Sequence, residues 1–111
     1  MRKDDRLYLN HMRDHARKAR ALAAGKTRPQ FDADETLRLA LSYLLQIIGE
    51  AASHISQNTK RAHPEIPWPN IVGMRHRLVH GYFQIDEDVV WKTVTTELDP
   101  LLAAIDDLLK S

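Results

Sequence analysis

A long apolar stripe in the middle of the chain constrains the fold more than any other feature. Between residues 37 and 55, apolar side chains recur every three or four positions, which is the period of an α-helix. The stripe is wide enough to bury more than one face, so we expect this helix to lie at the centre of the fold. Its members are Leu37, Ala40, Leu41, Leu44, Leu45, Ile48, Ala51, Ala52 and Ile55.

The residues before this stripe carry a helix-start signal. Asp32 and Glu35 have the spacing of a capping box, and Phe31 occupies the position of a hydrophobic staple. We therefore expect the central helix to be capped by Asp32 and to end near Asn58.

The rest of the chain predicts three further helices. A first helix is expected over about residues 4–24 with Gly25 as its stop, followed by a loop at "KTRPQ", which contains Pro29. The proline-rich stretch "RAHPEIPWPN" is expected to be a loop that leads into a short third helix over about residues 69–80, ended by Gly81.

A fourth helix, capped by Asp86, is expected to run to about Lys110 and to kink at Pro100. Trp68 and Trp91 are interpreted as core anchors rather than base-stacking platforms. No segment predicts a strand. The expected fold class is therefore all-α, with one domain over residues 1–111 built as an antiparallel helical bundle of about four main helices.

Composition narrows the class of protein. The chain has 111 residues and no cysteine, which excludes disulfides and thiol chemistry and suits a cytoplasmic location. It has no apolar run long enough for a membrane span, so no membrane partner is expected.

Charge is spread unevenly along the chain. Residues 1–28 hold nine basic and three acidic residues, a net of +6, whereas residues 81–111 hold two basic and seven acidic residues, a net of −5. Either the first helix faces an anionic partner, or the two helices have solvated faces of opposite sign.

The chemistry is concentrated in "MRHRLVHGYF", residues 74–83. Arg75 offers a permanent planar cation that matches two phosphate oxygens, and His80 can transfer a proton near neutral pH. Because RNA supplies its own nucleophile, the 2′-hydroxyl, this pair could cleave a phosphodiester without a metal or other cofactor. Five residues of one regular helix would make the two side chains diverge by roughly 140°. They would converge only if the helix loosens before Gly81, or if two copies of the segment face each other in a homodimer.

Neighbouring polar residues have weaker signals. His76 with His80, and His11 with His15, have the spacing of a helical zinc pair, but no third ligand follows, so no metal site is predicted. Arg77 could position a phosphate or be solvated. Glu50 lies in an apolar run, either at a helix edge in water or directed toward Arg75.

The run from Arg75 to Tyr82 fits the pattern Arg-x-x-x-x-His-x-Tyr and resembles the HEPN-domain toxins of the HepT type, the partners of MNT-type minimal nucleotidyltransferase antitoxins. The segments "IIGEAASHIS", "IPWPNIVGMRHRLVHGYFQID" and "VVWKTV" extend the resemblance over most of the chain, in the order found in that family. His76 stands where the family often has asparagine.

The resemblance implies a HEPN-like fold and a homodimeric, metal-independent endoribonuclease toxin that cleaves tRNA or mRNA, with Arg75 and His80 as the catalytic pair and His76, Glu50 and Arg77 as possible supports. It also implies that the antitoxin silences the toxin by adding AMP to Tyr82. Two alternatives stay open: Tyr82 as a packing aromatic, and the whole chain as a catalytically inactive module that binds a nucleotidyltransferase.

Overall fold

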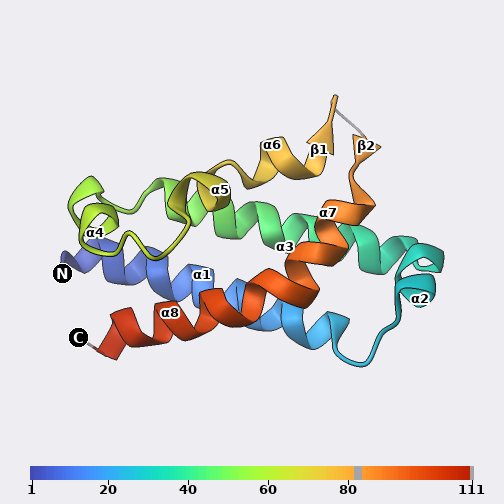
Figure 1. Ribbon diagram of the computed structural model, residues 1–111, viewed down its shortest axis with the longest axis horizontal. Coiled ribbons are helices and arrows are strands. Elements are labelled where there is room, and N and C mark those ends of the chain that lie inside the picture. The colour runs from blue at the N-terminus through green and yellow to red at the C-terminus, as the bar shows by residue number, and fades with distance from the viewer. Residues whose placement is uncertain (82–83, 111) are drawn as a thin grey trace.

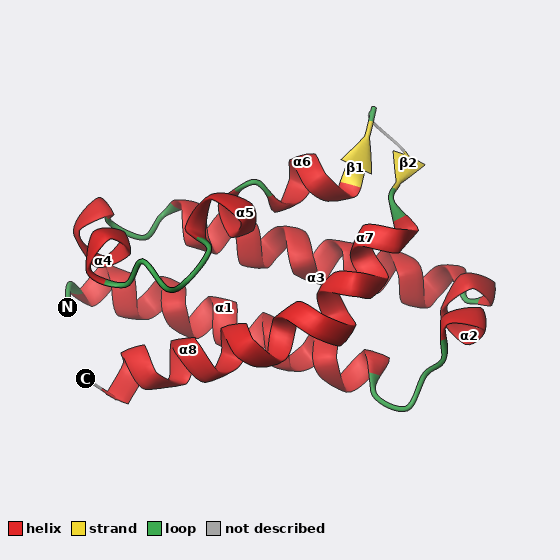
Figure 2. Ribbon diagram, viewed as in Figure 1, coloured by secondary structure: helices red, strands yellow, loops and turns green. Residues whose placement is uncertain are grey.

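The computed structural model describes residues 1–81 and 84–110, and its frame is three long helices packed side by side (Figures 1 and 2). Helix α1, Lys3–Ala23, runs antiparallel to α3, Glu35–Ser53, and α8, Leu98–Lys110, returns along α1. The side chains of α3 that pack inward, such as Leu41, Leu45 and Ile48, are completely buried. The all-α class and the central position of this helix are therefore confirmed.

The connection between α1 and α3 differs from the expected loop. Gly25 ends α1 with a φ of +74°, a left-handed conformation that glycine adopts readily. The chain then forms a short helix, α2, Arg28–Ala33, which Thr27 and Gln30 close with a reciprocal capping box. Pro29 lies in its first turn, where a missing N–H costs nothing, so the proline starts a helix instead of breaking one.

The central helix is shorter than predicted at both ends. Its N-cap is Asp34, whose carboxylate accepts the Leu37 N–H at 3.0 Å, so the prediction of Asp32 as the cap was wrong. The helix ends at Ser53, not near Asn58, because Ser56 caps a separate short helix, α4, Gln57–Ala62.

Asp5 of α1 fixes the point at which α3 ends and α4 begins. Its carboxylate, only 2% exposed, accepts hydrogen bonds from the Ser56 N–H at 2.9 Å, the Ser56 hydroxyl at 2.6 Å and the Thr59 hydroxyl at 2.7 Å. Burial raises the pKa of Asp5, but the hydrogen bonds from Ser56 and Thr59 outweigh it and leave that pKa below its ordinary value. The start of α4 is thus tied to the start of α1.

The predicted third helix is broken into pieces. Helix α5, Trp68–Val72, stops at Gly73, and α6, Met74–Leu78, follows it. Residues Val79–His80 then form a short strand, β1, which pairs antiparallel with β2, Gln84–Ile85. The expectation of a continuous helix to His80, and of a fold without strands, was wrong, because Val79 is already extended.

The predicted fourth helix begins as expected, with Asp86 capping α7, Glu87–Lys92. A π-helical segment, η1, Thr93–Glu97, joins α7 to α8, and within it the Leu98 N–H bonds the Thr93 carbonyl five residues back. The departure from α-geometry therefore precedes Pro100 by about one turn. Two features accompany this segment. Pro100 has no N–H to donate to a carbonyl of the preceding turn. Three threonine hydroxyls of η1 donate hydrogen bonds to carbonyls of α7 at 2.6–2.7 Å, which can bend a helix.

Part of the uneven charge is balanced by ion pairs between α1 and α8 at the surface of the bundle. Arg17 and Arg20 of α1 lie 3.6 and 3.3 Å from Asp106 and Asp99 of α8, and Arg6 donates to the Leu109 carbonyl at 3.0 Å. The basic face of the first helix thus meets the acidic face of the last one, which neither sequence interpretation included.

The two tryptophans take the roles predicted for them. Trp68 is buried and donates its indole N–H to the His63 carbonyl at 3.0 Å, and the Trp91 ring packs 5.1 Å from the Phe31 ring. Within the described residues, no helix is both long and apolar enough to cross a membrane.

Candidate active site

The motif segment is held against the central helix by a close backbone approach. A Cβ on Gly49 would lie 2.6 Å from the Ile71 carbonyl oxygen and 2.9 Å from the Met74 Cβ. Only glycine permits this spacing between α3 and the junction of α5 with α6. The two short helices that carry the motif are therefore anchored to the most buried element of the fold.

Arg75 lies on the outer side of α6 and is exposed. A surface groove is lined by Arg75 and His76 together with the backbone and side chains of Val72, Gly73, Val79 and Gly81. Among residues 1–81 and 84–110, no side chain forms a hydrogen bond or ion pair with the Arg75 guanidinium. Within that part of the chain, nothing competes with an anion for this arginine.

Arg77, two residues further on, points to a different partner. Its guanidinium lies 3.2 and 3.3 Å from the two carboxylate oxygens of Glu97 in η1. This pair ties α6 to the π-helical segment. Arg77 is therefore neither freely solvated nor available in the Arg75 groove.

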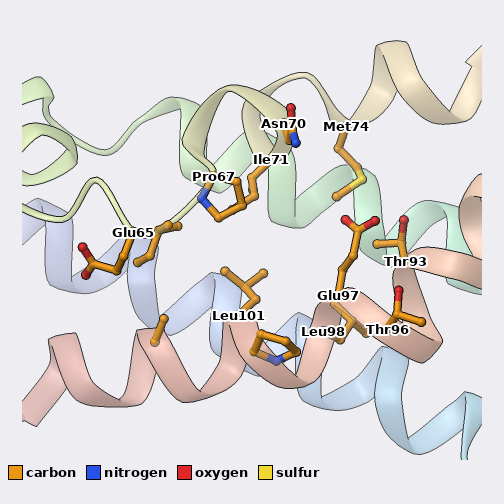
Figure 3. Close-up of a pocket in the computed structure, with 13 residues that line it drawn as sticks. Glu65, Pro67, Asn70, Ile71, Met74, Thr93, Thr96, Glu97, Leu98 and Leu101 are labelled. Carbon is orange, nitrogen blue, oxygen red and sulfur yellow. The ribbon is translucent and has the colours of Figure 1, made fainter.

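Beside this pair is a pocket of about 300 Å³ between the Pro67–Met74 segment and the η1–α8 segment (Figure 3). Glu97 and Leu101 line it from the η1–α8 side and Ile71 lines it from the facing side (Figure 3). Most of its other lining residues, such as Ile66 and Ala104, are also apolar. Arg75 and His80 are not among its lining residues, so it is separate from the motif groove.

His80 is positioned by the strand pair and not by α6. Its Nε2 lies 2.9 Å from Oδ2 of Asp86, and its side chain is 58% exposed. Hydrogen bonds from His80 and from the Val89 N–H hold the pKa of Asp86 below its ordinary range. The sequence identified Asp86 only as a helix cap, so its contact with His80 was missed.

The structure separates two of the predicted partners within one chain. Successive side chains of a strand point to opposite faces, and Val79 lines the Arg75 groove. In the described part of the chain, His80 is not a lining residue of that groove, whereas His76 is. One protomer therefore brings Arg75 together with His76, and brings His80 together with Asp86.

The remaining predicted residues have these positions. Glu50 is exposed, and its carboxylate lies 3.4 Å from Nε2 of His54 on the same helix. The His76–His80 zinc pair required one continuous helix, which the structure does not have. In α1, Nδ1 of His15 lies 2.8 Å from the His11 carbonyl. No three His, Asp or Glu side chains in residues 1–81 and 84–110 are grouped to hold a metal ion. Tyr82 lies outside the described residues.

Comparison with known proteins identifies a family for the chain. The family model described as "Ribonuclease HepT-like" matches residues 12–108. No solved structure matches the chain.

Two named relatives agree with that match. A protein of Thermococcus cleftensis named "Probable ribonuclease HepT" is 41% identical over 80 residues, which cover 72% of this chain and 73% of that protein. A protein of Caldanaerobacter subterraneus subsp. tengcongensis, named provisionally as an RNase, is 30% identical over 108 residues, 97% of this chain and 96% of that protein. The expectation of a ribonuclease is confirmed, and the chain belongs to the HepT-like ribonuclease family.

Proposed function

We propose that this protein is a metal-independent endoribonuclease toxin that cleaves RNA through attack of the 2′-hydroxyl. The observation that carries the proposal is the exposed Arg75 guanidinium in its groove. Arg77, on the same short helix, is neutralised by Glu97, whereas Arg75 has no such partner among the described residues. A planar guanidinium without a carboxylate is suited to clamp two phosphate oxygens and to stabilise the charge that develops on them.

The reaction needs two proton transfers. The 2′-oxygen forms a bond to phosphorus and loses its proton, while the bond from phosphorus to the 5′-oxygen breaks and that oxygen gains a proton. The products are a 2′,3′-cyclic phosphate and a free 5′-hydroxyl. One histidine can serve as the base or as the acid in a single pass, so a complete site requires a second proton-transferring group.

A homodimer would supply that second group. Because His80 does not line the Arg75 groove of its own chain, two motif segments facing each other across a two-fold axis would combine Arg75 and His76 of one protomer with His80 of the other, so that one histidine acts as base and the other as acid. In the competing arrangement, His76 acts in the Arg75 groove without a histidine from a second protomer.

Catalysis is tested with purified protein, total RNA and EDTA. Wild type should cleave in chelator, whereas His80→Gln and Arg75→Lys should each lose activity by about 100-fold or more, since a point ammonium cannot reproduce the guanidinium fork. His63→Gln is the matched histidine control, because His63 also lies beside a carboxylate, Glu65, at 3.3 Å. Wild-type cleavage by His80→Gln, or activity that requires added metal, would refute the mechanism.

The composite cleft is tested by mixing the two inactive variants. Co-expressed Arg75→Lys and His80→Gln chains form mixed dimers in which one cleft keeps both native residues. Recovery of cleavage supports the composite site. Two results would assign the reaction to a single chain and favour His76. One is a fully active protein that light scattering shows to be a monomer, and the other is mixed dimers that stay inactive.

Regulation by a partner completes the proposal. We expect a cognate minimal nucleotidyltransferase antitoxin to add AMP to Tyr82, two residues after His80, placing a bulky phosphate beside the proposed cleft. Intact-mass spectrometry after co-expression should show AMP on wild type and none on Tyr82→Phe. Growth arrest on expression of the chain alone distinguishes a toxin from an inactive binding module.

A further inference from the structure

Backbone hydrogen bonds hold Asp86 in place for its contact with His80. Oδ2 of Asp86 lies 2.9 Å from Nε2 of His80, while Oδ1 accepts the Val89 N–H at 3.1 Å in the first turn of α7. The Asp86 N–H donates in turn to the Leu78 carbonyl at 2.7 Å. Both carboxylate oxygens and the backbone of this residue are thus fixed, and one oxygen faces the imidazole.

The helix that carries Asp86 is itself tied to the body of the protein. Glu87 lies 3.6 Å from Arg38 of α3, and Asp88 lies 2.6 Å from Arg28 of α2. The antiparallel pairing of β1 with β2 brings His80 opposite Gln84, just ahead of this helix start. The carboxylate is therefore presented from a fixed platform to a side chain on the neighbouring strand.

Two other histidines of the chain also lie beside acidic side chains, but those acidic side chains are more exposed than Asp86. His54 pairs with Glu50 and His63 with Glu65, but those glutamates are 73% and 61% exposed. Asp86 is 29% exposed and has its second oxygen bound by a backbone N–H. Only this carboxylate combines shielding from water with a fixed orientation, among the histidine partners in the described residues.

We propose that Asp86 is a positioning residue for His80: it accepts the proton on Nε2 and leaves Nδ1 as the nitrogen that exchanges a proton with RNA. A neutral imidazole has one protonated nitrogen and one with a lone pair, and the hydrogen bond at one nitrogen selects which is which. The carboxylate also stabilises the imidazolium formed when Nδ1 takes a proton. This inference rests on the proposed catalytic role of His80.

The decisive variant is Asp86→Asn, because it keeps the helix cap. Asparagine caps helices about as well as aspartate, so its oxygen can stay on the Val89 N–H. Its NH₂ group then faces His80 and requires a lone pair on Nε2, which inverts the tautomer. The measurement is the nitrogen NMR signal of His80, at a pH where the imidazole is neutral. The signal is assigned by its absence in His80→Gln. A merely structural role of Asp86 would leave this signal unchanged.

We expect wild type to show the proton on Nε2 and Asp86→Asn to show it on Nδ1. The kcat for RNA cleavage should fall about 10- to 100-fold with KM unchanged within about twofold. Asp34→Asn is the matched control, since Asp34 caps α3 by the same kind of bond, to Leu37, without a histidine beside it. That control should leave both the tautomer and kcat unchanged.

Several outcomes would overturn the inference. A wild-type His80 with its proton on Nδ1 would refute it without any variant, as would Asp86→Asn with unchanged kcat. Asp86→Ser provides a second test, since serine also caps the helix but is too short to replace the carboxylate at His80. If His80→Gln is fully active, the proposed function fails; if only Asp86→Asn is unchanged while His80→Gln is inactive, the positioning role alone fails.

Discussion

Replacing Asp5 by alanine should destabilise the fold strongly, because this buried side chain ties α1 to the start of α4. Three hydrogen bonds end on this buried carboxylate, and bonds to a charged group contribute about 1.5–3 kcal/mol each. The contributions are not additive, and water can reach part of Ser56 once the carboxylate is gone. We therefore expect a loss of about 3–5 kcal/mol in the free energy of unfolding. For a domain of this size, that loss lowers Tm by roughly 12–20 °C.

The measurement is urea unfolding followed by far-UV circular dichroism, with Asp4→Ala as the matched control. Asp4 lies in the same first turn of α1 but is exposed, so its loss should cost about 0.5 kcal/mol or less. If Asp5→Ala is within about 1 kcal/mol of this control, the carboxylate does not anchor α4 as the contacts indicate.

The same carboxylate gives the stability a defined pH dependence. Because the folded pKa of Asp5 is lower than its unfolded value, its contribution is complete above the unfolded pKa and is lost as the pH falls through the folded pKa. As the pH falls below about 4, the free energy of unfolding of wild type should therefore decrease more steeply than that of Asp5→Asn, whose side chain cannot titrate. Parallel curves for the two proteins would contradict this.

Further predictions concern the segment that carries the motif. Gly49→Ala should cost about 1–3 kcal/mol, measured by urea unfolding, because its Cβ would overlap the Ile71 carbonyl. Gly81 has a φ of +68°, so Gly81→Ala should lower RNA cleavage more than Gly81→Asn, which tolerates that conformation better. A double-mutant cycle on Arg77 and Glu97, whose side chains are 29% and 38% exposed, should give a coupling of about 1 kcal/mol or less.

The sequence predicted the long helices because each one carries a sustained apolar period. The bounds of α1 were right to within a residue at either end, and the central stripe is buried as expected. Errors occurred where two local signals competed. Asp32 and Asp34 both precede the stripe, and only the structure shows that Asp34 reaches the Leu37 N–H. Ser56 ends the central helix because a residue 51 positions away, Asp5, bonds to it.

The candidate site was predictable in its residue types but not in its geometry. The Arg75 and His80 spacing was visible, whereas the end of α6 at Leu78 depends on pairing between β1 and β2. Asp86 was recognisable as a cap, but nothing in its spacing indicated that its second oxygen reaches His80. Side-chain partners across a turn depend on strand register, which a single sequence does not specify.

The π-helical segment η1 makes the chain tolerant of a change in length at one point. A π-turn contains one residue more than an α-turn, so it is equivalent to a single-residue insertion into an otherwise regular helix. Deleting one residue there would restore α-geometry and leave the residues that follow in nearly the same orientation, because the wider π-turn already absorbs the extra residue. The buried stripe of α8, including Leu98, Leu102 and Ile105, would still face α1, and its acidic residues would keep the arginines they now face. A deletion within α8 itself would instead rotate everything after it by about 100°. Related chains should therefore tolerate a gap of one residue within residues 93–97 far better than one within α8.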